Sequence, residues 1–199
     1  MEHIISSKKL SIIDIQNIID GRCTLRIGDE ARRAIVRCRE YLDSKMEDLD
    51  HPVYGVTTGF GSLCNITIAP DDLSRLQHNL VMSHACGTGD TVRPEIVRIM
   101  LLLKIQSLSY GHSGAQLETV QRLADMFNSD VLPVVYQQGS LGASGDLAPL
   151  AHLSLPLIGM GEVIYRGERR NVAELWPELG WKPLTLKSKE GLALLNGTQ

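Results

Sequence analysis

Residues 139–152 read GSLGASGDLAPLAH, and the interpretation of the whole chain starts from this stretch. At its centre, Ala143, Ser144 and Gly145 are small enough for a tight bend to bring their backbones together. The amide nitrogen of Gly145 can then attack the carbonyl carbon of Ala143, and loss of water closes a five-membered ring. Glycine suits this position because it has no Cβ and tolerates strained backbone angles. Elimination of the Ser144 hydroxyl as a second water leaves an electron-poor alkene in a 4-methylideneimidazole-5-one group.

Such a ring would give the chain a carbon electrophile, which side chains do not supply and which enzymes usually take from a metal or an organic cofactor. Ala-Ser-Gly also occurs by chance in loops, so the residues that flank it decide its meaning. The apolar spacing of residues 147–158 predicts a buried helix with Pro149 in its first turn, which Pro156 kinks or ends. The tripeptide then lies at a helix N-terminus, where partial positive charge increases the electrophilicity of a conjugated alkene.

Most of the remaining chain has the apolar periodicity of helices, and it contains no internal repeat. Residues 162–170 alternate around a turn and predict a small hairpin. The sequence therefore predicts a mainly α fold with minor β hairpins. Five further helices are expected: at 12–20, from 28–30 onward, from Pro70 toward Gly87, at 94–110 and at 114–128. The first of these is expected to be capped by Ser11 and ended by Gly21.

Two details of these helices are specific enough to test. In the helix that starts at 28–30, the charged residues Arg32, Arg33, Arg37, Arg39 and Glu40 are expected to lie mostly outward, on a solvated face. Ser188 is expected to cap a last helix over 190–195.

The composition limits the classes of partner. With 199 residues, 43% of them hydrophobic, the chain can bury a core as one domain. A net charge of -3 gives no general attraction to nucleic acid or to anionic membranes. The most apolar run, 96–108, is too short and too interrupted by polar residues to cross a bilayer. No secretory signal is recognisable, so we expect a cytoplasmic protein that binds small molecules or copies of itself.

Cysteines and histidines give no metal site. The chain has no Cys-x-x-Cys pair, so neither a zinc site nor a disulfide framework is expected, and the cysteines are interpreted as free buried thiols. His112 and His152 have no acidic or cysteine partner at ligand spacing and are interpreted as structural. The four cysteines are Cys23, Cys38, Cys64 and Cys86.

The segment 142–152 closely resembles the signature of the histidine, phenylalanine and tyrosine ammonia-lyases, which carry this self-made ring. Residues 54–61, YGVTTGFG, resemble the tyrosine loop of that family, and residues 195–199, LNGTQ, resemble its asparagine motif. The resemblance extends from about residue 10 to residue 199. It implies that residues 1–199 form the helical N-terminal domain of the ammonia-lyase (aspartase/fumarase-like) fold, without the C-terminal helical bundle. It also implies a homotetramer in full-length members and an inactive fragment when this part stands alone.

The resemblance also implies roles for individual residues. The ring from Ala143, Ser144 and Gly145 would accept the substrate amine and make the nitrogen a better leaving group. Tyr54 would take a proton from the β-carbon, which requires a site that favours the phenolate. The amide of Asn196 would bind near the ring and the polar end of the substrate.

His84 corresponds to the position where this family meets the substrate side chain. A buried imidazole can pair with another imidazole or with a phenol. An unsubstituted phenyl ring would leave it unpaired, at a cost of roughly 1–3 kcal/mol. The expected reaction is therefore the conversion of L-histidine to urocanate and ammonia.

Alternatives remain open at each of these positions. Tyr54 can simply pack under its loop, Asn196 can form an Asn-Gly turn, and His84 can terminate its helix. The chain as a whole can belong to a tyrosine or phenylalanine ammonia-lyase or to an aminomutase. It can also be a non-catalytic helical module in which the ring never forms.

Overall fold

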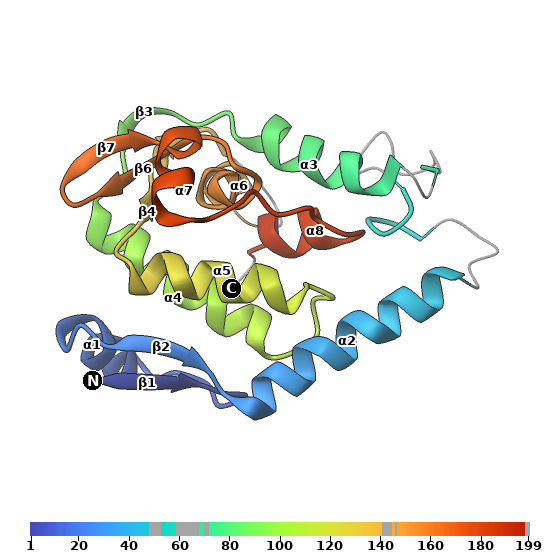
Figure 1. The fold of residues 1–199 in the computed structure, drawn as a ribbon, viewed down its shortest axis with the longest axis horizontal. Helices are drawn as coiled ribbons and strands as arrows, with labels where there is room; N and C mark the ends of the chain where they lie inside the picture. The colour runs from blue at the N-terminus through green and yellow to red at the C-terminus, as the bar shows by residue number, and fades with distance from the viewer. Residues whose placement is uncertain (48–52, 59–67, 70–71, 141–144, 146, 198–199) are drawn as a thin grey trace.

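The computed structural model describes residues 1–47, 53–58, 68–69, 72–140, 145 and 147–197. Its longer elements are helices, and the strands are short, as Figure 1 shows. The helices are α1 (Ile12–Asp20), α2 (Asp29–Glu47), α3 (Leu73–His84), α4 (Pro94–Ser109), α5 (Leu117–Asn128), α6 (Leu147–Ser154), the 3₁₀ helix η3 (Leu155–Ile158), α7 (Val172–Leu179) and α8 (Glu190–Leu195). The strands are β1 (Glu2–Ile5), β2 (Thr24–Ile27), β3 (Thr88–Thr91), β4 (Leu132–Pro133), β5 (Tyr136–Gln138), β6 (Glu162–Tyr165) and β7 (Glu168–Asn171).

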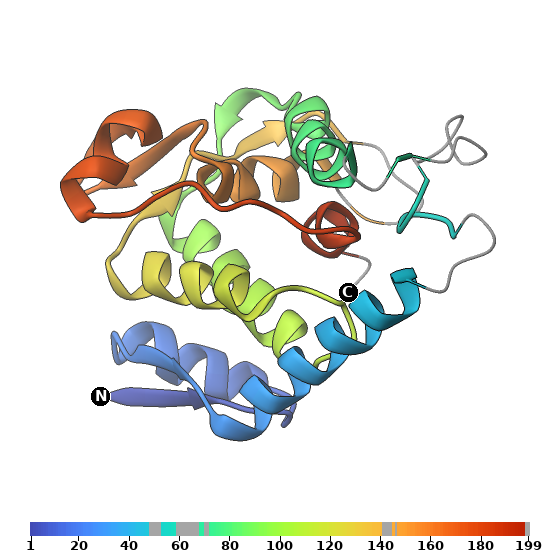
Figure 2. The same cartoon turned by 45° about the vertical axis from the view of Figure 1, so that its right-hand side comes forward.

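The elements form three levels around a central helix pair. Helices α4 and α5 pack against each other in the middle (Figures 1 and 2). The parallel pair β1–β2 and helix α1 lie on one side of that pair, and α3, α6, α7 and α8 lie on the other. Strands β4, β6 and β7 form an antiparallel sheet in the order β4-β6-β7, and β3 pairs with β5. The main core lies between these levels and includes the fully buried Leu101, Ile105, Leu123 and Phe127.

Local sequence explains where the helices begin and end. Ser11 caps α1 with a capping box, in which its hydroxyl accepts from the Asp14 backbone and the Asp14 carboxylate accepts from the Ser11 backbone. Pro94 occupies the first turn of α4, where its missing N–H costs nothing. At Pro156 the helix that began as α6 tightens into the 3₁₀ turn η3 and ends at the left-handed Gly159.

The mainly α prediction is confirmed, and so is the hairpin, which is β6–β7. Two predictions about individual side chains are wrong. Arg39 is 6% exposed rather than outward, because its guanidinium donates to the buried carbonyls of Gly114 and Ser188. Ser188 does not cap α8, because the N-cap residue is Lys189 in a left-handed conformation.

The cysteine prediction holds in part. Cys23 is a free buried thiol and Cys38 is free and half-buried, but Cys86 is exposed, and Cys64 lies outside the described residues. Within the described part of the chain, no group of three His, Cys, Asp or Glu side chains is placed to hold a metal ion. None of the helices described above is long and apolar enough to cross a bilayer.

Candidate active site

Three helices that each adjoin a predicted site residue pack around one small apolar cluster. Leu80 of α3, Ala151 of α6 and Leu195 of α8 form its buried centre, which is separate from the main core. His84 ends α3, Gly145 lies just before α6, and Asn196 directly follows α8. The fold therefore brings together three motifs that are far apart in the sequence. We call this cluster, with the partly buried Leu76, Ala85 and Leu147 that pack against it, the site core.

The tripeptide and the asparagine motif touch at one point of the backbone. Gly145 forms an isolated parallel β-bridge with Gly197. The φ angle of Gly145 is 102°, in the region that a residue with a Cβ rarely adopts. This geometry suits the last residue of a backbone-derived ring, which needs an unusual bend and no side chain. Ala143 and Ser144 themselves lie outside the described residues.

A side chain at position 197 would require the end of the Leu150 side chain to move. A Cβ at this position would lie 2.4 Å from Cδ1 of Leu150 on α6. Glycines thus stand at both positions where the backbones before α6 and after α8 meet.

His84 is half-buried at the end of α3. Its Nδ1 lies 2.8 Å from the carbonyl oxygen of Leu80, one turn back, and 3.3 Å from the hydroxyl of Ser83. A carbonyl oxygen can only accept, so Nδ1 carries the proton in this bond. In a neutral ring Nε2 is then an acceptor, which is the form that can receive a hydrogen bond from an imidazole N–H or a phenol.

Asn196 is exposed and is one of the residues that line a groove. Its backbone N–H donates to the Leu192 carbonyl at 3.0 Å and ends α8. The groove has a volume of about 900 Å³, and its lining includes Leu103, Leu192, Asn196 and Gly197. Asn196 directly precedes Gly197, which bridges Gly145, and the role of its amide remains a prediction.

Tyr54 lies in a turn between Val53 and Thr57, and it is 57% exposed. The turn is held by the Val56 and Thr57 N–H groups, which both donate to the Val53 carbonyl. Tyr54 is not part of the site core. Its role as a base therefore remains a prediction.

Lys104 is a buried cation near this site whose role the sequence analysis missed. It is 6% exposed, and its Nζ donates to the carbonyl oxygens of Asn196 at 2.8 Å and Ala193 at 3.3 Å. Burial lowers the pKa of the Lys104 ammonium from 10.5 to about 8. The signal for it was a lysine inside the most apolar run of the chain, which we interpreted only as an interruption of that run.

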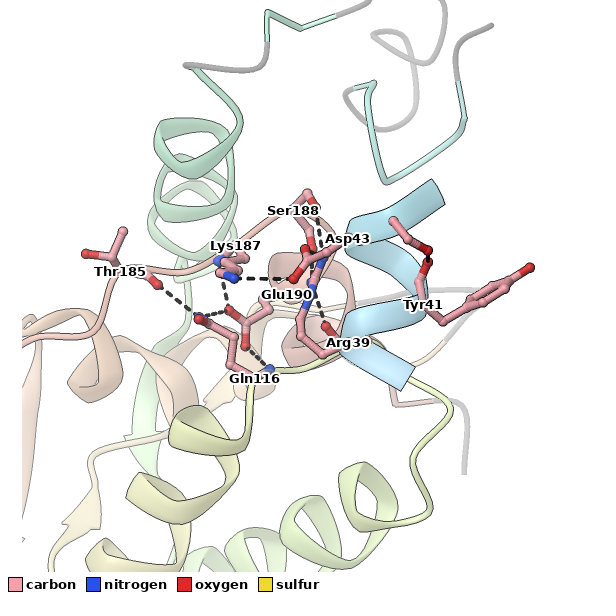
Figure 3. Close-up of polar contacts among 10 residues, drawn as sticks. Arg39, Tyr41, Asp43, Gln116, Thr185, Lys187, Ser188 and Glu190 are labelled. Atoms are coloured by element: carbon pink, nitrogen blue, oxygen red, sulfur yellow. Dashed lines mark hydrogen bonds and ion pairs between the residues drawn. The ribbon is translucent and has the colours of Figure 1, made fainter. Parts of the chain in front are cut away.

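The other end of α8 is fixed by a second buried charge, Glu190, which is 0% exposed (Figure 3). One carboxylate oxygen accepts from the Gln116 N–H at 2.9 Å and from the Thr119 hydroxyl at 2.6 Å. The other accepts from the Gln116 side-chain amide at 2.6 Å and from the Lys187 N–H at 2.8 Å. Four donors satisfy the carboxylate without a direct ion pair, and they attach α8 to the start of α5.

Arg39 joins the same region to α2. Its guanidinium donates to the Gly114 carbonyl at 2.7 Å, to the Ser188 carbonyl at 2.9 Å, and to the Asp43 carboxylate at 2.5 Å (Figure 3). The pKa of the Asp43 carboxyl is lowered: burial opposes the shift, but the hydrogen bond and charge of Arg39 outweigh it, with Lys187 adding to the effect.

His152 links α6 to the segment that follows α3. Its Nε2 accepts from the Gly87 N–H at 2.9 Å, and its ring packs edge-on against Tyr136 with centroids 5.0 Å apart. Burial lowers the pKa of the His152 imidazole, which keeps the accepting nitrogen free of a proton. These contacts agree with the structural role predicted for His152.

Comparison with known proteins gives consistent matches over the whole chain. The sequence pattern of the family described as "Aromatic amino acid lyase" matches residues 10–199. The histidine ammonia-lyase of Deinococcus radiodurans is 47% identical over 196 residues, which are 98% of this chain and 37% of that protein. The chain thus spans less than two-fifths of the length of this curated relative.

Solved structures give the same result. The histidine ammonia-lyase of Trypanosoma cruzi superimposes with a TM-score of 0.87 at 38% identity, over 100% of this chain and 38% of that one. The phenylalanine aminomutase of Pantoea agglomerans superimposes with a TM-score of 0.91 at 33% identity, again over 100% of this chain and 38% of the other. The predicted fold class is therefore confirmed, and the same fold occurs with different substrates.

Proposed function

This chain belongs to the aromatic amino acid lyase family, and we propose that it forms the ring-bearing N-terminal part of an enzyme that converts L-histidine to urocanate and ammonia. The observation that carries the proposal is the bridge between Gly145 and Gly197, which sets the last residue of the tripeptide beside a residue of the asparagine motif. The 47% identity to a histidine ammonia-lyase supports the choice of substrate.

The prosthetic group would be a 4-methylideneimidazole-5-one made from Ala143, Ser144 and Gly145. The positive φ of Gly145 and its place before α6 fit such a ring. When formed, it would supply an electrophilic carbon for the substrate amine, so no metal is needed for this step.

The remaining roles belong to side chains of this chain. Tyr54, as phenolate, would accept a proton from the substrate β-carbon. Asn196 would hold the polar end of the substrate with its exposed amide. His84 would accept a hydrogen bond at Nε2 from the substrate imidazole, because its Nδ1–H already donates to the Leu80 carbonyl.

We also propose that residues 1–199 act as one domain of a longer cytoplasmic homotetramer. Support comes from the relatives, of which the chain covers 37% in Deinococcus radiodurans. A net charge of -3 agrees with small-molecule partners rather than with nucleic acid or membranes.

The test uses a full-length lyase that contains this chain, with Ser144→Ala as the variant and Ser129→Ala as a matched control at an exposed position. The unchanged enzyme should have an intact mass two waters below that of the unmodified chain and should release urocanate from L-histidine. Ser144→Ala should keep the full mass and lose nearly all turnover, whereas Ser129→Ala should behave like the unchanged enzyme.

Product analysis separates the alternatives. A cinnamate-type acid from tyrosine or phenylalanine, without urocanate from histidine, would overturn the proposed substrate. A β-amino acid would identify an aminomutase. A full unmodified mass in the unchanged enzyme would identify a non-catalytic module.

A further inference from the structure

Lys104 is a charged residue that the proposed function does not yet use. It belongs to α4, in the central level of the fold, yet its Nζ reaches the carbonyl oxygens of Ala193 and Asn196. These carbonyls lie in the last turn of α8 and directly after it, where a helix has no backbone donors left to satisfy them. Lys104 thus binds the backbone at the point where α8 passes into the asparagine motif.

The position of that backbone matters for the site. The carbonyl of Asn196 belongs to the peptide that leads into Gly197, which forms the bridge with Gly145. A shift of this peptide would therefore move the Asn196 amide and the contact with the tripeptide together. The end of the Leu150 side chain occupies the space on the α6 side of Gly197, where a Cβ would lie.

An apolar side chain in place of Lys104 would leave the Ala193 and Asn196 carbonyls without this donor, whereas Lys104 satisfies both at the cost of burying a charge. A buried ammonium loses its hydration, and an apolar side chain of similar length would fill the same space without that cost. The lowered pKa of Lys104 reflects this penalty. The benefit of lysine at this position lies in directed donation to two specific carbonyls.

We propose that Lys104 is a positioning residue that holds the Asn196–Gly197 backbone in register with Gly145. The inference rests on the proposed function, in which this register matters because it places the Asn196 amide. Lys104 donates to the backbone carbonyls of Ala193 and Asn196, so it acts through the backbone.

The test compares three variants of a full-length lyase that contains this chain. Lys104→Met removes the donor and keeps the length, and Lys104→Arg keeps a cationic donor. Lys189→Met is the matched control, because Lys189 lines the same groove but donates to the Ser113 carbonyl at 2.6 Å. The measurements are kcat and KM for L-histidine, the melting temperature, and amide hydrogen exchange of the peptide covering residues 192–197.

We expect Lys104→Met to lower kcat about 10- to 100-fold per folded, ring-bearing subunit, with a smaller change in KM. Exchange of residues 192–197 should become faster in this variant, and Lys104→Arg should restore much of both properties. Lys189→Met should leave kcat and the exchange of this peptide close to those of the unchanged enzyme.

Two results would overturn the inference: unchanged exchange of residues 192–197 in Lys104→Met, or equal losses of kcat in Lys104→Met and Lys189→Met. A loss of activity that only follows a loss of folded protein would also overturn it. If the unchanged enzyme does not act on histidine, the proposed function fails, but the exchange measurement still decides the role of Lys104.

Discussion

The main core and the site core are held together in different ways. The main core joins α4 and α5 to the elements on both sides through fully buried apolar side chains such as Leu101, Leu123 and Phe127. The site core has three buried apolar residues, and polar side chains attach its helices to their surroundings. Gln77 of α3 accepts from the Gly191 N–H at 2.8 Å, while Glu190, Lys104 and His152 fix α8 and α6.

This difference follows from what each core has to do. Apolar burial is roughly proportional to area and has no direction, so it gives stability without fixing one backbone at a chosen point. Hydrogen bonds have preferred distances and angles, so they can set the Asn196 peptide against Gly145. We therefore expect substitutions in the main core to change stability most, and substitutions of the polar links to change the local order of the site core.

The largest expected effect tests the main core. Phe127→Ala should lower the free energy of unfolding by about 3–5 kcal/mol, because Phe127 is fully buried and leaves a cavity. Leu195→Ala in the site core should cost less, about 2 kcal/mol, because its cluster is small. Urea unfolding of the purified chain measures both, and an equal or larger loss for Leu195→Ala would remove the distinction between the two cores.

Lys104 should make stability depend on alkaline pH. Its pKa falls from 10.5 in the unfolded chain to about 8 in the fold, so the unfolded state binds more protons between these values. The penalty for the buried charge is complete below pH 8 and fades as pH rises toward 10.5. The unchanged chain should therefore gain about 3 kcal/mol relative to Lys104→Met over this range. A pH-independent difference between the two in urea unfolding would contradict the burial of a charged amine.

Glu190 tests the polar links directly. Glu190→Gln places an amide NH₂ against donors that now bind a carboxylate oxygen, so the free energy of unfolding should fall by about 2 kcal/mol. Amide exchange in α8 should rise more than in α4. Glu118→Gln, at an exposed position of α5, is the control and should change neither quantity. Uniform loosening of α4 and α8 would show that the link is not local.

His152 should give the smallest effect, and it should appear in acid. Burial lowers its pKa in the fold, so on acidification the unfolded chain takes up a proton first and stability falls as the pH drops below about 6.5. In His152→Gln the side-chain oxygen can accept from the Gly87 N–H, and stability should depend less on acidic pH. The hydrogen bond contributes about 1 kcal/mol to the free energy of unfolding. Urea unfolding at a series of pH values measures this dependence. The same loss of stability in acid for the unchanged chain and for His152→Gln would contradict the role given to His152.

The sequence predicted well those features that depend on local pattern. Ser11 caps α1 and Pro156 lies where α6 gives way to η3, as the local pattern predicted. The resemblance of three separate motifs, in the right order along the chain, also gave the correct family. These predictions succeeded because caps, prolines and apolar periodicity act within a few residues.

Features that depend on distant partners could not be predicted in the same way. Arg39 lies on a helix rich in arginine, and its burial follows from carbonyls 75 and 149 residues away. Glu190 was expected only as part of a short helix, although it accepts from residues of α5 and from the segment before it. Strands β1 and β2 were missed because they pair in parallel across α1, without the local turn that marks the β6–β7 hairpin. The motifs of the candidate site could therefore be predicted from the sequence, but the polar contacts that arrange these motifs could not.

The end of the Leu150 side chain fills the space beside Gly197, which has a consequence for protein engineering. A Cβ at 197 would lie 2.4 Å from the Leu150 side chain, so these two positions form a single design variable rather than two. A library that varies residue 197 alone would force the end of the Leu150 side chain to move, whereas one that also samples smaller residues at 150 opens the space that any new side chain would occupy.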